Sequence, residues 1–383
     1  MLIAVALIVS LFFLVQISCL FWILAEKQNE KLVWLLKTKK SELDSSKEWP
    51  KVSLFLAARN EEKLIMRSLE AISLLDYPKD KLEVLIGNDD STDKTKELVL
   101  DFISDRENFK LIDIKHNLGK GRGKANVLAH LAHEASGEFY FITDVDVQLP
   151  PSWIKGMLSN LNEEVGIASG MTMCERGSWF ADMQSIDWLH FMGYIKAFAK
   201  IDVACTSVGN NMMVRADAYW QTGGYENIDF SITEDYKLFK EVTSNGWRWK
   251  NELNSKTLGL AWYIPSVKEM LHQRKRWLIG ARELPLNWKI LIILYGLFIP
   301  ALFLLFMYSP LLAGITWFLK LMAQSLFITI LCQKLKVKPF RFYQLLFYEI
   351  YVIINTLATA VFYLLPIKSV WKGRKYNSSN LTT

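Results

Sequence analysis

The 383-residue chain has long apolar stretches near both ends and a region of mixed hydrophobic and polar positions between them. Residues 1–25 carry no charged side chain, residues 290–319 carry none either, and residues 342–366 carry only Glu349. A membrane-spanning helix needs about 20 predominantly apolar residues. We therefore expect one membrane helix at the start of the chain. The C-terminal part predicts three more apolar segments, at about 288–308, 311–331 and 343–366.

The first apolar stretch is either a membrane anchor or a cleaved signal peptide. It has no basic residue at its start and no small-x-small motif before the first charges, which favours the anchor. Lys27, Lys31 and Lys37 follow it closely, and clustered lysines favour the cytoplasmic side of a membrane. We therefore expect the next domain to be cytoplasmic. Three later spans would put the basic tail on the opposite side, so either one segment lies in the membrane interface or the tail is an exception.

Two charged residues, Lys320 and Glu349, lie within the C-terminal apolar stretches. A charge inside a membrane is costly and tends to find a partner. An ion pair between neighbouring helices is therefore one interpretation. The other is that the long lysine side chain reaches the lipid headgroups while its stem stays in apolar surroundings.

Between the apolar ends, short apolar runs alternate with segments of helical periodicity. Predicted strands cover 51–58, 82–90, 109–116 and 138–146, and predicted helices cover 61–75, 92–104 and 123–135. This alternation predicts an α/β domain with a mostly parallel sheet covered by helices on both faces. We divide the chain into a transmembrane anchor (1–25), a juxtamembrane linker (26–48), the α/β domain (49–282), a C-terminal membrane region (283–368) and a basic tail (369–383).

Polar clusters end three of the predicted strands. They are Arg59-Asn60-Glu61, Asn88-Asp89-Asp90 and Asp144-Val145-Asp146. Ligands of open α/β sheets bind at the carboxyl ends of the strands, so the three clusters predict one site. A simpler role also fits the second cluster, because Ser91, Thr92 or Asp93 can cap the helix that follows.

Asp144 and Asp146 are candidates for a metal site. Residues i and i+2 of a strand point the same way, so both carboxylates can reach one spot. Two adjacent carboxylates repel each other unless a cation lies between them. A hard divalent cation that also holds a diphosphate would fit there. The alternative interpretation of an isolated Asp-x-Asp is a solvated turn.

The segment 117–130 alternates glycines with basic residues up to Lys124 and then opens a helix. Glycines let the backbone approach a ligand closely, and a helix N-terminus favours phosphate. A flexible basic loop is the alternative, and the spacing is not that of a P-loop.

Glu234 and Asp235 begin another predicted helix. Acids at this position either complement the helix dipole or provide a base that removes a proton from a hydroxyl group.

The segment 271–280, "LHQRKRWLIG", lies just before the long uncharged stretch. Arg274, Lys275 and Arg276 could neutralise a phosphate-bearing leaving group, and Trp277 offers an apolar face to a sugar ring. A basic patch on anionic lipid headgroups is the alternative.

Composition narrows the class of protein further. The formal net charge is +6, and the basic residues gather beside the apolar stretches, which suits a membrane surface. Nothing in the pattern indicates nucleic-acid binding. The four cysteines, at positions 19, 174, 205 and 332, have neither metal-binding spacing nor the pattern of a disulfide framework, which fits a reducing cytoplasmic domain.

Six short motifs in a fixed order resemble those of one enzyme family. They are "AARNEE", "NDDSTD", "GKANVLAHL", "DVD", "TED" and "QRKRW". Together they resemble the membrane-bound family 2 glycosyltransferases, a group that includes cellulose, chitin and hyaluronan synthases and enzymes similar to ceramide glucosyltransferase. The resemblance covers residues 51–282 and the flanking apolar segments, and it implies a Rossmann-like GT-A catalytic domain.

The resemblance also implies roles for single residues. Nucleotide-sugar contacts are implied for Arg59, Glu61, Asp89, Lys124 and Asp144. Asp235 matches the catalytic base, and Asp146, together with Asp144, matches the ligands of a Mg²⁺ or Mn²⁺ ion. Gln273, Arg276 and Trp277 match a Gln-x-x-Arg-Trp motif that lies beside the diphosphate and the acceptor.

One motif departs from the family pattern. Many family members have aspartate where this chain has Asn88 and glycine where it has Asp90. The match could therefore shift by one residue, and Asp90 is the alternative to Asp89.

The implied reaction is an inverting transfer of a sugar, with UDP-sugar as the favoured donor, to a membrane lipid or lipid-linked acceptor. The few predicted spans favour this acceptor, as does the tail "VWKGRKY" (370–376), which resembles the ending of lipid-directed relatives. The alternative is a processive polysaccharide synthase, and a second alternative is an inactive sensor or scaffold. The expected location is the inner or plasma membrane. The donor sugar, the oligomeric state and the choice between Mg²⁺ and Mn²⁺ are open at this level.

Overall fold

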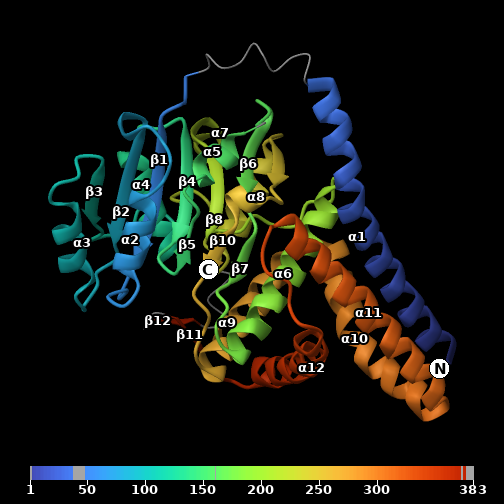
Figure 1. Ribbon diagram of the computed structural model, residues 1–383. Coiled ribbons are helices and arrows are strands. Elements are labelled where there is room, and N and C mark those ends of the chain that lie inside the picture. The colour runs from blue at the N-terminus through green and yellow to red at the C-terminus, as the bar shows by residue number, and fades with distance from the viewer. Residues whose placement is uncertain (1, 38–47, 160, 372–373, 377–383) are drawn as a thin grey trace. The chain divides into compact units, whose positions relative to one another are not determined.

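The computed structural model describes residues 2–37, 48–159, 161–371 and 374–376, which fall into two compact units (Figure 1). The sheet unit contains residues 48–175, residues 206–263 and the chain from Lys368. The helical unit contains the chain up to Lys47, residues 176–205 and residues 264–367. Segments 176–205 and 264–282, which the sequence division includes in the α/β domain, therefore belong to the helical unit. Residues 38–47 of the expected linker and residues 372–373 and 377–383 of the expected tail lie outside the described part.

Seven strands form the main sheet of the sheet unit, in the order β3-β2-β1-β4-β8-β6-β9. Their bounds are β1 Val52–Ala58, β2 Leu82–Asn88, β3 Phe109–Asp113, β4 Phe139–Asp144, β6 Val165–Ser169, β8 Asn211–Arg215 and β9 Arg248–Asn251. Strands β1 to β4 pair in parallel, and β6 pairs in parallel with β9, while β8 runs antiparallel to β4 and β6. The predicted mostly parallel α/β fold is confirmed.

The remaining elements of the sheet unit connect and extend this sheet. The helices are α2 Ile65–Ser73, α3 Thr95–Ile103, α4 Lys124–Glu134, α5 Trp153–Leu158, α7 Ala216–Gln221 and α8 Glu234–Ser244. A smaller sheet contains β5 Val147–Gln148, β10 Gly259–Ala261 and β7 Thr172–Cys174, and β11 Ser369–Trp371 pairs with β12 Arg374–Tyr376.

The core of the sheet unit forms where the apolar strand residues meet the apolar faces of the helices. Leu54 and Leu56 of β1, Ile86 of β2 and Phe141 of β4 are fully buried. Trp153 of α5 packs edge-to-face on Phe141, and its indole N–H donates to the Asn211 side chain over 2.8 Å. Burying a large side chain of this kind contributes about 1.5–3 kcal/mol. The core thereby fixes the strands whose ends carry the polar clusters.

Strand β1 is the point at which the strand order reverses, because β2 lies on one side of it and β4 on the other. Ala58 is in register with Asn88, and Ala57 is in register with Asp144. The three polar clusters therefore emerge at the same edge of the sheet. This is the position at which open α/β sheets bind ligands.

Six α-helices form the described part of the helical unit. They are α1 Leu2–Lys37, α6 Trp179–Ala199, α9 Val267–Gly280, α10 Leu286–Tyr308, α11 Pro310–Lys334 and α12 Phe342–Leu364. Residues 2–25 of α1 and the whole of α10, α11 and α12 are long and apolar enough to cross a membrane. Helices α1, α10 and α11 lie side by side, whereas α12 does not follow their common direction (Figure 1).

The two charges within the apolar helices pair with each other. Lys320 of α11 and Glu349 of α12 are 4% and 2% exposed, and the lysine Nζ lies 2.5 Å from both carboxylate oxygens. The Gln324 side chain, one turn along α11, donates to the same carboxylate. The structure thus confirms the ion pair between neighbouring helices, and the Lys320 side chain does not reach toward the lipid headgroups.

Candidate active site

Two loops meet at the carboxyl ends of β1 and β2. The guanidinium of Arg59 donates to the main-chain oxygen of Asp89 and lies 3.8 Å from its carboxylate. Asp89 is buried, with 8% of its surface exposed, whereas Asp90 is exposed and adopts a positive φ of 53°. Of the two candidate acids, Asp89 is therefore the one that the fold holds in place.

Hydrogen bonds tie the same two loops together. The backbone N–H of Asn60 donates to the Ser91 hydroxyl, and the N–H of Glu61 donates to the Thr95 hydroxyl over 2.7 Å. The Asp93 carboxylate accepts from the Thr95 N–H at the start of α3. The N-cap residue itself is Lys94, which makes no side-chain cap hydrogen bond, so the cap predicted at Ser91, Thr92 or Asp93 is wrong by one residue or more. The hydrogen bonds of Asn60 and Glu61 join the two loops at the sheet edge.

Lys124 lies at the centre of a charged cluster at this edge. It is the first residue of α4, and its Nζ lies 2.6 Å from Asp144 at the end of β4 and 3.1 Å from Glu234 at the start of α8. The Nζ also donates to the main-chain oxygen of Gly209 over 3.3 Å. Burial opposes its charge, but Asp144, Glu234 and Asp235 together hold the pKa of Lys124 well above its usual range.

Asp235 is the most perturbed acid of the cluster. Burial and, after it, the neighbouring Glu234 raise the pKa of Asp235 to about 6, although the Gly209 N–H and Lys124 act in the opposite direction. Its carboxylate accepts from the N–H of Gly209 over 2.9 Å and from that of Tyr236 over 2.8 Å. Such a group is ionised at neutral pH and is a stronger base than an ordinary aspartate, which suits proton abstraction.

Gly209 is a site residue that its sequence context does not reveal. Its N–H contacts Asp235, and its carbonyl contacts Lys124. A Cβ atom at position 209 would lie 2.8 Å from the Cβ of Asp235, closer than side chains tolerate. The glycine therefore permits the approach of the acid to the backbone. Gly209 lies two residues before β8, and its contacts are with Lys124 and Asp235, which are distant in the sequence.

Asp144 and Asp146 have the donor chemistry of a divalent-metal site. Asp144 is partly exposed at the end of β4, and Asp146 follows, exposed, two residues later. No group of three His, Cys, Asp or Glu side chains in the described residues forms a complete metal centre. Two carboxylates nonetheless fit an ion that takes its other ligands from water and a diphosphate, as Mg²⁺ usually does.

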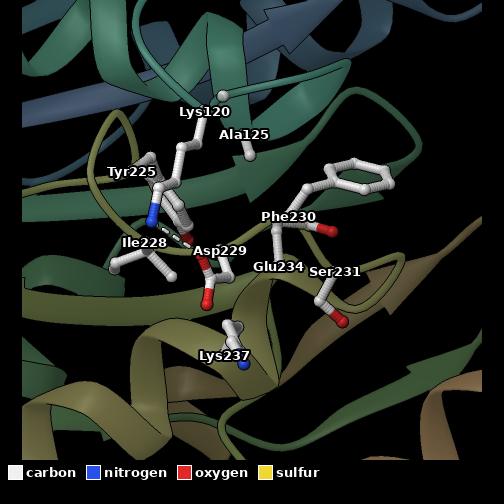
Figure 2. A pocket seen from close by; sticks show the side chains of 10 residues that line it. Lys120, Ala125, Tyr225, Ile228, Asp229, Phe230, Ser231, Glu234 and Lys237 are labelled. Carbon is white, nitrogen blue, oxygen red and sulfur yellow. Dashed lines mark hydrogen bonds and ion pairs between the residues drawn. The ribbon is translucent and has the colours of Figure 1, made fainter. Parts of the chain in front are cut away.

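The other two cations of the glycine-rich segment have local partners. Lys120 pairs with Asp229 over 2.7 Å, and Arg122 donates to the carbonyls of Gly119 and Gly121. Figure 2 shows the Lys120–Asp229 pair beside a small pocket that Glu234 also lines. Of the three basic residues in this segment, only Lys124 contacts Asp144 and Glu234.

The Gln-x-x-Arg-Trp residues belong to the helical unit. Gln273, Arg276 and Trp277 lie on α9, at the i, i+3 and i+4 positions that share one helix face. Trp277 packs edge-to-face against Trp188 of α6, with ring centroids 5.4 Å apart. The structure thus brings Arg59 to Asp89 and Lys124 to Asp144, Glu234 and Asp235 within the sheet unit. The role of the α9 residues remains a prediction.

Comparisons with known proteins agree with this architecture. The sequence model of glycosyl transferase family 21 matches residues 8–380. The chain is 26% identical over 244 residues to a poly-beta-1,6-N-acetyl-D-glucosamine synthase of Staphylococcus epidermidis (62% of this chain, 56% of the relative). It is 30% identical over 216 residues to the probable glycosyltransferase YdaM of Bacillus subtilis (53% of this chain, 49% of the relative). The chain therefore spans about half the length of these relatives.

A solved structure has the same fold. It is the mannosyltransferase PcManGT from Pyrobaculum calidifontis in complex with GDP-Man and Mn²⁺, which superposes with a TM-score of 0.55. The sequence identity is 18%, and the match covers 95% of this chain and 99% of that one.

Proposed function

Because this chain belongs to glycosyl transferase family 21, we propose that it transfers a sugar from a nucleotide sugar, with inversion, to a hydroxyl group of a growing glycan at the membrane. The observation that carries the proposal is the state of Asp235. A carboxyl group with a pKa of about 6, held by two backbone N–H groups, is ready to accept a proton at neutral pH.

In the proposed reaction, Asp235 takes the proton of the acceptor hydroxyl. The hydroxyl oxygen attacks the anomeric carbon of the donor sugar from the side opposite the diphosphate. One C–O bond forms, the bond to the diphosphate oxygen breaks, and the nucleoside diphosphate leaves with the electron pair. No covalent enzyme intermediate is needed, so one catalytic carboxylate is sufficient.

The chain's own charges support a donor site at the same edge. Asp89 and Arg59 would hold the nucleoside end with Glu61 nearby, and Lys124 would approach the diphosphate. We expect Arg276, which lies on α9, to stabilise the negative charge of the leaving diphosphate. Stabilising charge that develops in the transition state is commonly the largest electrostatic contribution to catalysis.

Asp146 and Asp144 would hold a Mg²⁺ or Mn²⁺ ion. When bound, such an ion supplies positive charge to the diphosphate oxygens. Lys124 already supplies one positive charge at this place, since its ammonium lies between Asp144 and Glu234. Mn²⁺ in the mannosyltransferase of the same fold supports the choice of a divalent cation.

The acceptor is the part of the proposal on which the sequence and the relatives differ. The sequence favours a lipid or lipid-linked acceptor, whereas the poly-beta-1,6-N-acetyl-D-glucosamine synthases favour the alternative of a polysaccharide synthase, which we adopt. Lipid glycosylation remains the second candidate for one reason. The described residues contain four helices able to span a membrane, which are few for a chain that must also pass a polymer through it.

We propose that the protein lies in the inner or plasma membrane with the sheet unit in the cytoplasm. The lysines that follow the first apolar helix support this orientation. Asp105 is an exposed position of the sheet unit, and all four native cysteines are buried. An Asp105→Cys variant in intact cells should therefore escape a membrane-impermeant maleimide and react after permeabilisation. Labelling of intact cells would contradict the orientation.

The first test of the activity uses the full chain in detergent with Mn²⁺ or Mg²⁺, a panel of UDP-sugars and native membrane extract as the acceptor source. We expect release of UDP with one donor, and loss of release in EDTA. A high-mass glycan product would support the polysaccharide synthase, and one sugar on an extractable lipid would support the second candidate. Binding of nucleotide sugars without any turnover, GDP-sugars included, would favour the inactive sensor or scaffold instead.

A further inference from the structure

The helix that carries the Gln-x-x-Arg-Trp residues is held by the two positions that the motif leaves unspecified, Arg274 and Lys275. Helix α9 begins after Ser266, whose hydroxyl accepts from the Glu269 N–H. Gln273 shares a helix face with Arg276 and Trp277 and not with either of these two residues. Both were predicted to neutralise a phosphate or a lipid headgroup, but both have protein partners.

Lys275 joins α9 to the end of α12. The residue is buried, with 6% of its surface exposed, and its Nζ donates to the carbonyls of Phe362 and Leu365 over 3.1 and 2.7 Å. The last carbonyls of a helix lack partners within the helix and carry partial negative charge. The positive charge of the buried Lys275 therefore interacts favourably with the C-terminal carbonyls of α12.

Arg274 joins α9 to α6. Its guanidinium pairs with Asp187, and the same guanidinium lies 4.4 Å from the ring centroid of Trp277. The second oxygen of Asp187 accepts from the Tyr348 hydroxyl of α12 over 3.0 Å. One carboxylate on α6 therefore contacts both α9 and α12. It also fixes the arginine that packs on the motif tryptophan.

We propose that Asp187 is a positioning residue that sets the orientation of Trp277 through Arg274. This inference rests on the proposed function for its consequence, because Trp277 would then present its ring to the acceptor in one fixed plane. Without the carboxylate, the guanidinium loses its ion pair with Asp187. Misplacing a group that orients the acceptor lowers transfer much more than it lowers binding of the donor.

The same helix offers a closely matched control. Asp182 of α6 pairs with Arg176 over 3.2 Å and accepts from the Gln344 side chain of α12. Arg176 in turn lies 3.9 Å from the ring centroid of Phe340. The two aspartates are 15% and 21% exposed, and each holds an arginine that stacks on an aromatic ring. The difference is that Asp187 holds α9.

The test compares Asp187→Asn with Asp182→Asn in the full chain labelled with 5-fluorotryptophan, with the Trp277 resonance assigned from Trp277→Phe. We expect the ¹⁹F resonance of Trp277 to shift or broaden in Asp187→Asn and to stay in place in Asp182→Asn, while both variants melt within a few degrees of each other. An unchanged Trp277 resonance in Asp187→Asn would overturn the inference, whatever the enzyme does.

The second measurement is the fate of the donor sugar with native membrane extract as the acceptor source. Asp187→Asn should raise the ratio of free sugar to transferred sugar by roughly tenfold, with an unchanged KM for the donor, and Asp182→Asn should leave that ratio unchanged. Arg274→Gln should act like Asp187→Asn, and the double variant should be no worse than either. Equal ratios in both aspartate variants would overturn the role in acceptor placement. Absence of turnover in the unmodified chain would contradict the proposed function, and the ¹⁹F measurement would still decide the inference.

Discussion

Lys124 of the sheet unit and Lys320 of the helical unit are both enclosed by carboxyl groups, but the balance of charge differs. Lys320 has one carboxylate, Glu349, and the pair is almost completely buried. Lys124 has Asp144 and Glu234 within ion-pair distance and Asp235 close enough to affect its pKa. The first arrangement is neutral and closed. The second has an excess of negative charge at a partly exposed sheet edge, and it can accept further positive charge.

This difference in charge balance suggests different roles. The Lys320–Glu349 pair stabilises the helical unit, whereas the Lys124 cluster is expected to serve the reaction. Breaking a buried pair leaves an uncompensated charge and costs stability. Removing one of several acids from a crowded cluster relieves repulsion and costs activity instead.

The largest effect is expected from Asp235→Asn. Loss of the base should lower sugar transfer by about 10³-fold, because general base catalysis is worth 10²–10⁴-fold. The melting temperature should not fall at pH 7, since burial disfavours the ionised form of Asp235. Asp217→Asn is the control. Asp217 also lies in the first turn of a helix and accepts from the next N–H over 2.8 Å, but it is exposed on α7. Turnover of Asp235→Asn near that of the control would contradict the assignment.

The next largest effect is expected in the helical unit. Lys320→Glu or Glu349→Lys alone should lower the free energy of unfolding by about 3–5 kcal/mol, because each leaves like charges buried together. The double exchange, Lys320→Glu with Glu349→Lys, should recover most of the loss. Thermal unfolding in one detergent measures all three variants. A double variant as unstable as the singles would show that the pair's orientation, rather than its neutrality, is required.

A moderate effect is expected from pH. Asp235 must be ionised to act as a base, and its pKa in the folded protein is about 6, raised chiefly by burial. Transfer should therefore fall as the pH drops through 6, by about tenfold for each further pH unit, and this group should not limit the rate above pH 7. Rates at saturating donor between pH 5 and 8 measure the profile. A rate that stays unchanged down to pH 5 would mean that Asp235 does not act as the base.

The smallest effect is expected at Asp90. Asp90→Asn should change transfer by no more than about twofold, as is usual for exposed positions, whereas Asp89→Asn should raise the KM for the donor several-fold. Donor KM values for the two variants decide which acid contacts the nucleotide. A larger effect at Asp90 would favour the alternative match of the motif, shifted by one residue.

Much of the sheet unit could be predicted from the sequence, because its signals are local. Alternating apolar runs give β1, β2, β3 and β4, and their polar ends converge because parallel strands end at one edge. The sequence predicts Lys124 as a nucleotide contact, whereas its ion pairs with Asp144 and Glu234 depend on where α4 and α8 begin in the fold. The role of Gly209 could not be predicted, because it depends on how close a distant helix start comes to one peptide group.

The division of the chain into units was not predictable in the same way. Helix α6 carries Asp182, Asp187 and Lys196 among apolar residues and has the composition of a soluble helix as much as of a membrane-associated one. Its place in the helical unit depends on contacts with α1, α11 and α12, which lie far away in the sequence. The partners of Arg274 and Lys275 escaped prediction for the same reason, since they lie 87 to 90 residues away.

The interruption of the sheet unit by α6 has a consequence for biosynthesis. Strand β4 pairs with β8, but the ribosome makes α6 between them, and the helices α11 and α12 that pack against α6 are made last. Strands β4 and β8 can therefore pair before α11 and α12 are available to pack against α6. During translation, α6 therefore remains without α11 and α12 until more than 100 further residues of the chain have been made. A nascent chain halted after β10 should carry the strands and helices that hold Lys124, Asp144 and Glu234 but an incomplete helical unit.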